Sequence, residues 1–350
     1  MRKTIGWLAA APDGLRPAPL ERRELRPDDI AVRVDYCGLC HSDLQALRGH
    51  DGHSPLVPGH EFTGVVSEVG PDVTAFSVGD TVAVGNIVDS CGQCPMCRAG
   101  QENFCHSFPT LTYGGRDRVD GSTTLGGFSR EYVVREDFAY RLPAGLDPAA
   151  AAPLMCAGIT VWEPLRALEV GPGARVAVVG LGGLGHLAVK FAVALGATTT
   201  VISRTPDKAE DARRLGAHGF VVSTDSVQMA EARESFDVVI DTVSAPHDLA
   251  AYLNLVGMNG TLSVLGYLGP VTVEVTDLLM GRKKLTAAGS GGRPSTAEML
   301  QFCAAHGVVP EVEMLPSAQN DTALRRLADN DVRYRFVLDM SDLDGADPFG

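Results

Sequence analysis

The sequence lacks both a long apolar run and a long run of like charges. Its 30 Lys and Arg residues are outnumbered by 43 Asp and Glu residues, which gives a formal net charge of −13. Binding to a phosphate backbone or an anionic membrane surface requires clustered positive charge. The longer apolar stretches are studded with Gly or broken by Lys190, which argues against a membrane span. The sequence therefore disfavours nucleic-acid and membrane partners.

The N-terminal stretch is not expected to be a secretion signal. The stretch after Lys3 is apolar only briefly and contains Thr4 and Gly6, whereas a signal peptide requires a longer apolar region. We interpret this stretch as a first β-strand. Eight cysteines without such a signal indicate metal sites rather than disulfides, so we expect a cytoplasmic protein.

A chain of 350 residues is long for a single core and predicts two domains. Residues 1–150 contain short β-rich runs punctuated by Gly and Pro, a pattern typical of a barrel or sandwich. Residues 151–291 alternate strands with helices, which predicts a doubly wound parallel sheet. Residues 292–350 are too few for a domain, and we expect them to return to the first one. The predicted fold class is α/β with a β-rich part.

The stretch from Tyr36 to Gln45 concentrates reactive side chains behind a strand-like run. Its Cys37-Gly-Leu-Cys40-His41 core has the form of a c-type haem attachment site, and the two cysteines alone match a thioredoxin-like redox motif. A third interpretation is one part of a zinc site whose other ligands lie far along the chain. These residues alone leave all three interpretations open.

A second cluster, which we call the four-cysteine lobe, consists of Cys91, Cys94, Cys97 and Cys105. Four thiolates in a short Gly- and Pro-containing loop can close a tetrahedron around one Zn²⁺, and a site without an open position is structural. Iron–sulfur clusters usually space their cysteines differently, and disulfides do not suit a reducing compartment. We predict a structural zinc site in this lobe.

A glycine-rich segment, Gly180-Leu181-Gly182-Gly183-Leu184-Gly185, follows a buried strand and opens an Ala- and Leu-rich helix. That context turns a weak G-x-G-x-x-G match into a dinucleotide-binding prediction. The first glycine permits a tight turn, and the second lets the backbone approach a pyrophosphate on the helix N-terminus. The alternative is a tight turn that binds no ligand.

The end of the following strand indicates which dinucleotide is bound. An acidic residue there would hold the ribose 2′-hydroxyl of NAD, but this sequence reads Ser203-Arg204-Thr205 with Lys208 close behind. A guanidinium, an ammonium and two hydroxyls suit a 2′-phosphate, so the residues favour NADP(H). The alternative is that Arg204 and Lys208 are solvated charges at a helix start.

Two further residues are candidates for a metal site. His60 lies in Pro-Gly-His-Glu, and Cys156 lies far along the chain. With Cys40 they would make an open site whose fourth position takes water or substrate. An isolated His is more often a surface or core residue with its hydrogen bonds made, and an isolated Cys is more often a core residue. The pattern alone is therefore a weak signal for a metal site.

The order of these motifs resembles that of the zinc-dependent medium-chain alcohol dehydrogenases, and most closely that of the cinnamyl-alcohol-dehydrogenase subfamily. The resemblance rests on Cys-Gly-Leu-Cys-His-Ser-Asp (37–43), Pro-Gly-His-Glu (58–61), the four-cysteine lobe, Leu-Met-Cys-Ala-Gly-Ile-Thr (154–160), Gly-Leu-Gly-Gly-Leu-Gly-His (180–186), Val-Ile-Ser-Arg (201–204) and Asp-Val-Arg-Tyr-Arg-Phe-Val (331–337). It implies a GroES-like catalytic domain, residues 1–150 with 292–350, and a Rossmann NADP-binding domain, residues 151–291.

The resemblance also implies residue roles. It gives Cys40, His60 and Cys156 as catalytic zinc ligands and leaves Cys37 as a buried free thiol. Other implied roles are Asp43 orienting the ligating His, Glu61 as a transient ligand beside the metal, Ser42 touching the substrate oxygen, and Thr160 and Ser290 lying near the cofactor.

One position departs from the family pattern. Many members continue a proton relay with His three residues after the hydroxyl, but this chain has Gln45, which cannot titrate. We expect the proton relay either to end in water or to continue through His50 or His53 in place of the missing His.

The resemblance implies two Zn²⁺ ions per chain, NADP(H), and reversible hydride transfer between the cofactor and a primary alcohol or aldehyde, aromatic or allylic ones included. It also implies a homodimer, for which we expect strands at 261–265 and 271–275 to form the edge. The alternatives are an NADPH-dependent 1,4-reductase of conjugated aldehydes and a zinc-stabilised nucleotide-binding structural protein. The complete Cys40, His60 and Cys156 set argues against the last of these.

Overall fold

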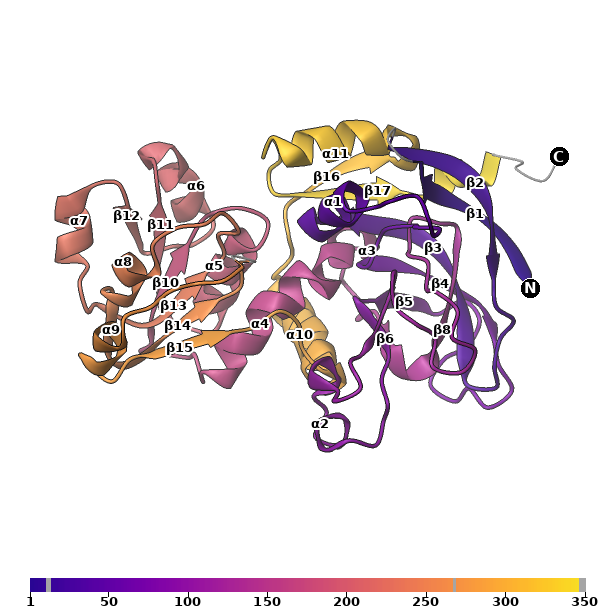
Figure 1. Ribbon diagram of the computed structural model, residues 1–350, viewed down its shortest axis with the longest axis horizontal. Coiled ribbons are helices and arrows are strands. Elements are labelled where there is room, and N and C mark those ends of the chain that lie inside the picture. The colour runs from indigo at the N-terminus through magenta and orange to yellow at the C-terminus, as the bar shows by residue number, and fades with distance from the viewer. Residues whose placement is uncertain (11–13, 267–268, 346–350) are drawn as a thin grey trace. The chain divides into compact units, whose positions relative to one another are not determined.

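The computed structural model describes residues 1–10, 14–266 and 269–345 and divides into two compact units (Figure 1). Unit 1 comprises Met1–Cys156 and Gly291–Gly350, and unit 2 comprises Ala157–Ser290. The two ends of the chain therefore belong to one body, and the middle segment forms the other. No helix among the described residues is both long and apolar enough to cross a membrane.

Unit 1 is built around strand β3 (Asp29–Leu39), which pairs antiparallel with three other strands. Within the described ranges the sheet runs β16 (Val312–Pro316), β17 (Arg335–Asp339), β3, β4 (Phe62–Val69), β5 (Thr81–Val84) and β9 (Ala139–Arg141), with β8 (Glu131–Arg135) also on β3. Ile30, Val32 and Val34 of β3 are fully buried. The buried side chains of this central strand are part of the hydrophobic core of unit 1.

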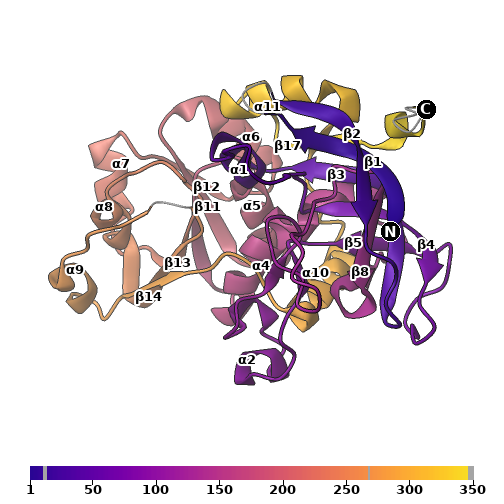
Figure 2. The ribbon, with the colours of Figure 1, turned by 45° about the vertical axis from the view of Figure 1, so that its right-hand side comes forward.

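The C-terminal segment completes this sheet. Strand β17 runs antiparallel to the end of β3, with Phe336 opposite Leu39, and β16 is added parallel to β17. Helix α11 (Asn320–Ala328) connects the two strands and lies over them in both ribbon views (Figures 1 and 2). It buries Ala323, Leu324 and Leu327, so the segment is part of the unit 1 core.

Smaller elements surround the sheet. They are the paired strands β1 (Arg2–Ala9) and β2 (Leu15–Arg22), the paired strands β6 (Ile87–Asp89) and β7 (Thr110–Leu111), and the helices α1 (His41–Arg48), α2 (Pro95–Arg98), α3 (Pro148–Ala151) and α10 (Arg293–His306). Helix α3 and the 3-10 turn Ala152–Met155 pack against β3 and β4 with all residues from 149 to 155 buried. This packing is why unit 1 extends as far as Cys156.

Unit 2 contains a parallel sheet, as predicted. Across its described residues the strand order is β12 (Gly219–Val222), β11 (Thr198–Ser203), β10 (Arg175–Val179), β13 (Phe236–Asp241), β14 (Val256–Val264) and β15 (Lys284–Ala287). The order reverses between β10 and β13, and ligands of such sheets bind at the carboxyl ends of the strands beside this switch point. The glycine-rich segment follows β10 at this place.

Short helices link the strands of unit 2. They are α4 (Ala157–Ala167), α5 (Gly185–Ala194), α6 (Ala209–Arg214), α7 (Ser226–Glu231), α8 (Leu249–Leu253) and α9 (Val275–Leu279). Side chains such as Val179, Ile202 and Val239 form the core beneath them.

The expected strand over residues 271–275 is wrong. Residues 271–274 carry no regular structure, α9 begins at Val275, and the edge strand is β15 instead. The alternating Val residues favour a strand by propensity alone. Val271 and Val275 are 48% and 77% exposed, so this segment has no buried face that would hold it in a sheet.

Candidate functional site

The N-terminus of helix α1 positions two of the predicted site residues. Cys40 is the N-cap, and Asp43 is the third helical residue. Asp43 Oδ2 accepts the backbone N–H of Cys40 at 2.9 Å, which is one half of a capping box. The local helix signal therefore places the Cys40 thiol and the Asp43 carboxylate side by side.

The second oxygen of Asp43 reaches the segment that carries His60. Asp43 Oδ1 accepts the backbone N–H of Gly59 at 3.0 Å and lies 3.0 Å from His60 Nδ1. A carboxylate on Nδ1 fixes the ring tautomer and leaves Nε2 to bind a metal. Asp43 is fully buried, so this geometry is shielded from solvent.

Cys40, His60 and Cys156 converge into what we call the three-ligand group. His60 Nε2 lies 3.2 Å from Cys156 Sγ, the two sulfurs are 3.9 Å apart, and all three ligand atoms lie within 4.8 Å of one another. Two sulfurs on a tetrahedral Zn²⁺ are separated by about 3.8 Å. The residues therefore fit a zinc ion with three protein ligands and one open position.

The neighbouring thiol, Cys37, takes no part in this group. It is fully buried in the core of unit 1, with its Sγ 3.7 Å from the Gly38 carbonyl oxygen. The thiol of Cys40 pairs instead with Cys156, and the hydrogen bond between them is the largest cause of the lowered pKa of Cys40. The Cys-x-x-Cys spacing does not correspond to a pair of neighbouring thiols.

Glu61 lies beside the three-ligand group and has an unexpected partner. Its side chain is fully buried, and burial raises its pKa to about 7 against the opposing charge of Arg335. Arg335, on β17, donates to Glu61 Oε1. A side chain on Gly38 would collide with that same oxygen, so Gly38 makes room for the ion pair.

Sequence reasoning missed Arg335, although it lies within one of the motifs that carried the resemblance. Its partner is distant in the sequence, and only the pairing of β17 with β3 brings the C-terminal segment to this place. A buried carboxylate needs a counter-charge, but the burial of Glu61 is visible only in the structure.

Ser42 and Gln45 lie one helical turn apart on α1, and both are exposed. The Ser42 hydroxyl donates to Cys40 Sγ at 3.0 Å. The hydroxyl is therefore adjacent to a residue of the three-ligand group and in contact with solvent. Of the two histidines considered as substitutes, His53 is exposed and His50 is partly buried.

The four-cysteine lobe is compact. Cys91 Sγ and Cys97 Sγ are 3.9 Å apart, Cys94 Sγ and Cys97 Sγ are 3.5 Å apart, and the four sulfurs lie within 4.8 Å of one another. The backbone N–H of Cys97 donates to Cys94 Sγ and is the largest cause that lowers the pKa of Cys94 to about 6. All eight cysteines of the chain are free, so the lobe contains no disulfide and suits a closed zinc site.

The glycine-rich segment joins β10 to α5. Gly180 has a φ of +86°, and a side chain on Gly185 would approach the Gly180 carbonyl oxygen to 2.1 Å, so both positions require glycine. A Cβ on Gly182 would meet nothing within 4 Å. Space therefore lies over Gly182, where a pyrophosphate could approach the backbone.

The residues at the end of β11 divide into two groups. Arg204 and Thr205 are exposed beyond the partly buried Ser203. Lys208 turns back to the glycine-rich segment, and its Nζ donates to the Leu181 carbonyl oxygen at 2.9 Å. This contact joins the end of β11 to the dinucleotide loop.

Thr160 and Ser290 also lie close together within unit 2. The Thr160 hydroxyl donates to the carbonyl oxygen of Gly289 at 2.9 Å, which fixes α4 next to the residue that precedes Ser290.

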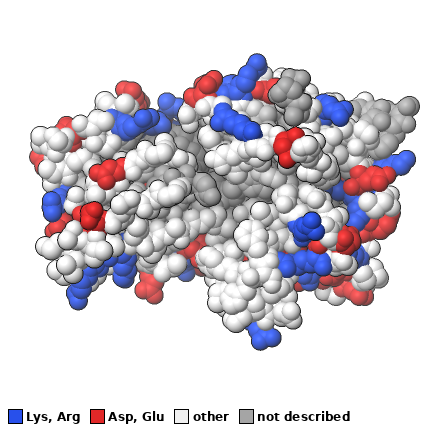
Figure 3. Space-filling view, viewed as in Figure 1, with Lys and Arg blue, Asp and Glu red and all other residues white. Residues whose placement is uncertain are grey.

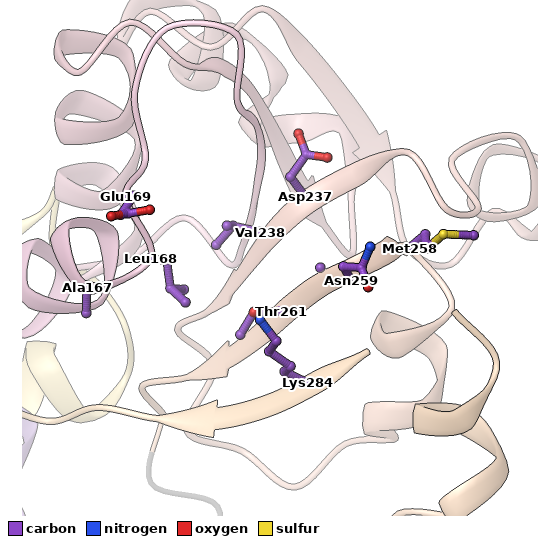
Figure 4. A pocket seen from close by; sticks show the side chains of 10 residues that line it. Ala167, Leu168, Glu169, Asp237, Val238, Met258, Asn259, Thr261 and Lys284 are labelled. Carbon is purple, nitrogen blue, oxygen red and sulfur yellow. The ribbon is translucent and has the colours of Figure 1, made fainter. Parts of the chain in front are cut away.

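A separate hollow of about 320 Å³ lies in unit 2 (Figure 4). Its lining includes Asp237 near the start of β13, Thr261 of β14 and Lys284 at the start of β15. The glycine-rich segment follows the opposite, carboxyl end of the parallel strands, so this hollow is not the predicted dinucleotide site.

Two family models match the chain. An alcohol dehydrogenase GroES-like domain matches residues 26–144, and a zinc-binding dehydrogenase domain matches residues 183–305. An NADP-dependent alcohol dehydrogenase of Mycolicibacterium smegmatis is 45% identical over 97% of this chain and 99% of its own length. A probable cinnamyl alcohol dehydrogenase of Arabidopsis thaliana is also 45% identical, over 97% of this chain and 94% of its own length.

Solved structures are similar over the same extent. A cinnamyl alcohol dehydrogenase of Sorghum bicolor has a TM-score of 0.93 and 42% identity, with full coverage of both chains. The Helicobacter pylori CAD in complex with NADP(H) has a TM-score of 0.89 and 34% identity, covering 97% of this chain and 98% of that one.

These matches define a zinc-containing dehydrogenase with a GroES-like domain and a Rossmann-type sheet, which confirms the predicted fold class. The chain belongs to the zinc-dependent medium-chain alcohol dehydrogenases and is of the cinnamyl-alcohol-dehydrogenase-like kind. It is therefore an oxidoreductase, and its two cysteine-containing groups fit the zinc ions of that family.

Exchange of Cys40 for Ser tests the three-ligand group. We expect Cys40→Ser to lower the zinc content of the purified protein from two ions per chain to one, because a hydroxyl replaces a thiolate ligand. Cys37→Ser changes the neighbouring thiol and is expected to keep both ions. Elemental analysis measures the result, and loss of an ion from Cys37→Ser would contradict the assignment.

Proposed function

We propose that the protein is an NADP(H)-dependent alcohol dehydrogenase and aldehyde reductase that acts on primary alcohols and aldehydes. The observation that carries this proposal is the three-ligand group, which provides a metal site with one open position. Unit 1 would act as the catalytic domain and unit 2 as the cofactor-binding domain. When bound, Zn²⁺ would polarise the oxygen of the substrate.

The residues of unit 1 have distinct parts in this proposal. Cys40, His60 and Cys156 would hold the metal, and Asp43 keeps His60 in the orientation that offers Nε2 to it. When bound, NADP(H) would supply or accept the hydride, and one proton would be taken up for each aldehyde reduced.

Ser42 would move that proton. Its hydroxyl is adjacent to Cys40 and is exposed, so it can exchange a proton directly with water. A second titrating group is not required in this arrangement, which accounts for Gln45 at a position where many relatives have His. The proposal assigns no proton transfer to His50 or His53.

NADP(H) is the cofactor that the residues of unit 2 favour. The end of β11 presents Ser203, Arg204 and Thr205 and no carboxylate, which suits a 2′-phosphate. The Mycolicibacterium smegmatis relative is an NADP-dependent alcohol dehydrogenase and the Helicobacter pylori structure is a complex with NADP(H), which supports the same choice. Lys208 would contribute to cofactor binding by holding the Leu181 carbonyl of the glycine-rich segment, and not by direct contact with the 2′-phosphate alone.

We further propose a small-molecule partner and a cytoplasmic location. On the face shown in Figure 3, Lys and Arg are interspersed with Asp and Glu, so this face has no continuous basic surface of the kind that binds a nucleic-acid backbone. Eight free cysteines suit a reducing compartment, and cell fractionation would test the location.

A homodimer is proposed through the β15 edge of unit 2. Among the described residues β15 pairs only with β14, and apolar side chains nearby are exposed, including Met258 (72%), Leu279 (66%) and Met280 (67%). An unpaired edge beside exposed apolar side chains is typical of an interface.

The choice between carbonyl and alkene reduction is tested with a conjugated enal. With NADPH and an aromatic enal we expect the allylic alcohol, because the three-ligand group is complete and zinc there would bind the carbonyl oxygen, next to the carbon that is reduced. Product analysis by gas chromatography separates this from the saturated aldehyde, which would indicate a 1,4-reductase. Failure of a chelator to abolish turnover would reject a zinc-dependent mechanism.

Arg204 is expected to determine the cofactor preference. Arg204→Ala should lower kcat/KM for NADPH by about 10- to 100-fold, the value of a charge-assisted hydrogen bond, and leave NADH almost unchanged. Arg213→Ala, which removes an exposed arginine from α6, is the matched control. An equal or better kcat/KM with NADH in the unaltered protein would reject the NADP(H) assignment.

The interface is tested by placing a charge on α9. Leu279→Glu is expected to convert the dimer to a monomer in sedimentation velocity, because the carboxylate would be desolvated in the interface. Val227→Glu, on α7 beside the opposite edge strand β12, places the same charge on another exposed apolar residue and should stay dimeric. A dimer that survives Leu279→Glu would place the interface elsewhere.

A further inference from the structure

Asp241 is a buried carboxylate at the carboxyl end of β13, beside the switch point of the unit 2 sheet. Its side chain is 0% exposed, and burial raises the pKa of its carboxyl group. The Oδ1 atom accepts the backbone N–H of Val243 at 3.1 Å. A buried carboxylate is costly unless donors satisfy it, so Oδ2 needs a partner from another part of the chain.

The partner of Oδ2 is His247. Its Nε2 lies 2.8 Å from Asp241 Oδ2, and its Nδ1 lies 2.8 Å from the carbonyl oxygen of Ala245. Both oxygens are acceptors in the ionised protein, whereas a neutral imidazole has only one N–H. His247 and Asp241 therefore share a further proton, and the contact between them is a charge-assisted hydrogen bond.

The Asp241–His247 pair closes the loop formed by residues 242–246. Asp241 is the last residue of β13, and helix α8 follows His247 with Asp248 as its N-cap. The His247 ring also lies edge-on to the ring of Tyr252 on α8, with the centroids 5.3 Å apart and an interplanar angle of 81°. Residues 244–246 are exposed, so the pair is the contact that joins the far end of this loop to the sheet.

The near end of the same loop packs against the glycine-rich segment. The N–H and the hydroxyl of Thr242 both donate to the Val179 carbonyl oxygen, at 3.0 and 2.8 Å. A Cβ on Gly180 would approach the Thr242 hydroxyl oxygen to 3.0 Å, and a Cβ on Gly185 would approach it to 3.2 Å. The loop and the glycine-rich segment are therefore in contact at the edge of the sheet where ligands of such folds bind.

We propose that His247 is a positioning residue of the dinucleotide site, which holds the loop 242–246 closed on Asp241 and keeps Thr242 against the glycine-rich segment. This inference rests on the proposed role of unit 2 as the cofactor-binding domain. It makes the affinity for the cofactor depend on a residue outside the glycine-rich segment and the end of β11. It gives His247 no contact with the reacting atoms.

Two amide variants of His247 separate its two hydrogen bonds. The amide nitrogen of His247→Asn stands in for Nδ1 and can reach Ala245, whereas that of His247→Gln stands in for Nε2 and can reach Asp241. We expect His247→Asn to raise the Kd of the zinc-loaded protein for NADPH about 10-fold, the effect of losing a hydrogen bond to a charged group, and His247→Gln to stay within about 3-fold. Fluorescence titration with NADPH in the absence of substrate measures the Kd.

Two further measurements distinguish positioning from chemistry. At saturating NADPH the kcat of His247→Asn should change less than about 2-fold, because His247 does not touch the reacting atoms. Hydrogen exchange over residues 242–248 should be faster in His247→Asn than in the unaltered protein and close to normal in His247→Gln. An unchanged Kd in His247→Asn would overturn the proposal, as would an equal rise in Kd in both amide variants.

The matched control is His218→Leu, which removes another histidine of unit 2, one whose Nδ1 accepts the backbone N–H of Thr199 at 3.1 Å near the amino ends of β11 and β12. It is expected to bind NADPH normally, and an equal rise in its Kd would indicate general destabilisation and overturn the proposal. If the unaltered protein binds NADPH and reduces no aldehyde, the proposed function fails, whereas the titrations still decide the role of His247. Binding of neither NADPH nor NADH would overturn both.

Discussion

The arrangement of the catalytic unit depends on the burial of one carboxylate, that of Asp43. A buried charge is costly unless donors surround it, and here the donors come from the start of α1, from the turn before His60 and from the His60 ring. Satisfying this carboxylate brings Cys40 and His60 to one point. Cys156, at the end of the 3-10 turn that packs on the sheet, then completes the three-ligand group.

A second buried charge ties the C-terminal segment to the same place. Glu61 and Arg335 are 0% and 5% exposed, and they meet because β17 pairs with the end of β3. The last strands of unit 1 therefore both close the sheet and supply the cation beside the metal ligands. In unit 2 the corresponding constraint is steric, because Gly180 and Gly185 approach too closely for any side chain.

The parts that the sequence predicted well depend on residues that are near neighbours in the chain. The parallel sheet of unit 2 follows from alternating strand and helix patterns, the four-cysteine lobe from spacing, and the glycine-rich segment from spacing together with its place between a strand and a helix. The strand expected over residues 271–275 is wrong because strand propensity alone does not hold a segment in a sheet when its side chains are exposed. Arg335 was missed because its partner, Glu61, lies far away in the sequence.

The sequence by itself determined the elements, the two cysteine groups as candidates and the family resemblance, since these depend on local patterns and on the order of motifs. The residues alone left open whether Cys40 pairs with Cys37 or with distant residues, and only the family resemblance implied His60 and Cys156. The tertiary structure shows how the three residues meet: Cys37 is buried within β3, whereas Cys40 caps α1 and lies with His60 and Cys156. The physical reason is that ligand geometry is a property of strand pairing and of buried charges, neither of which is local in the chain.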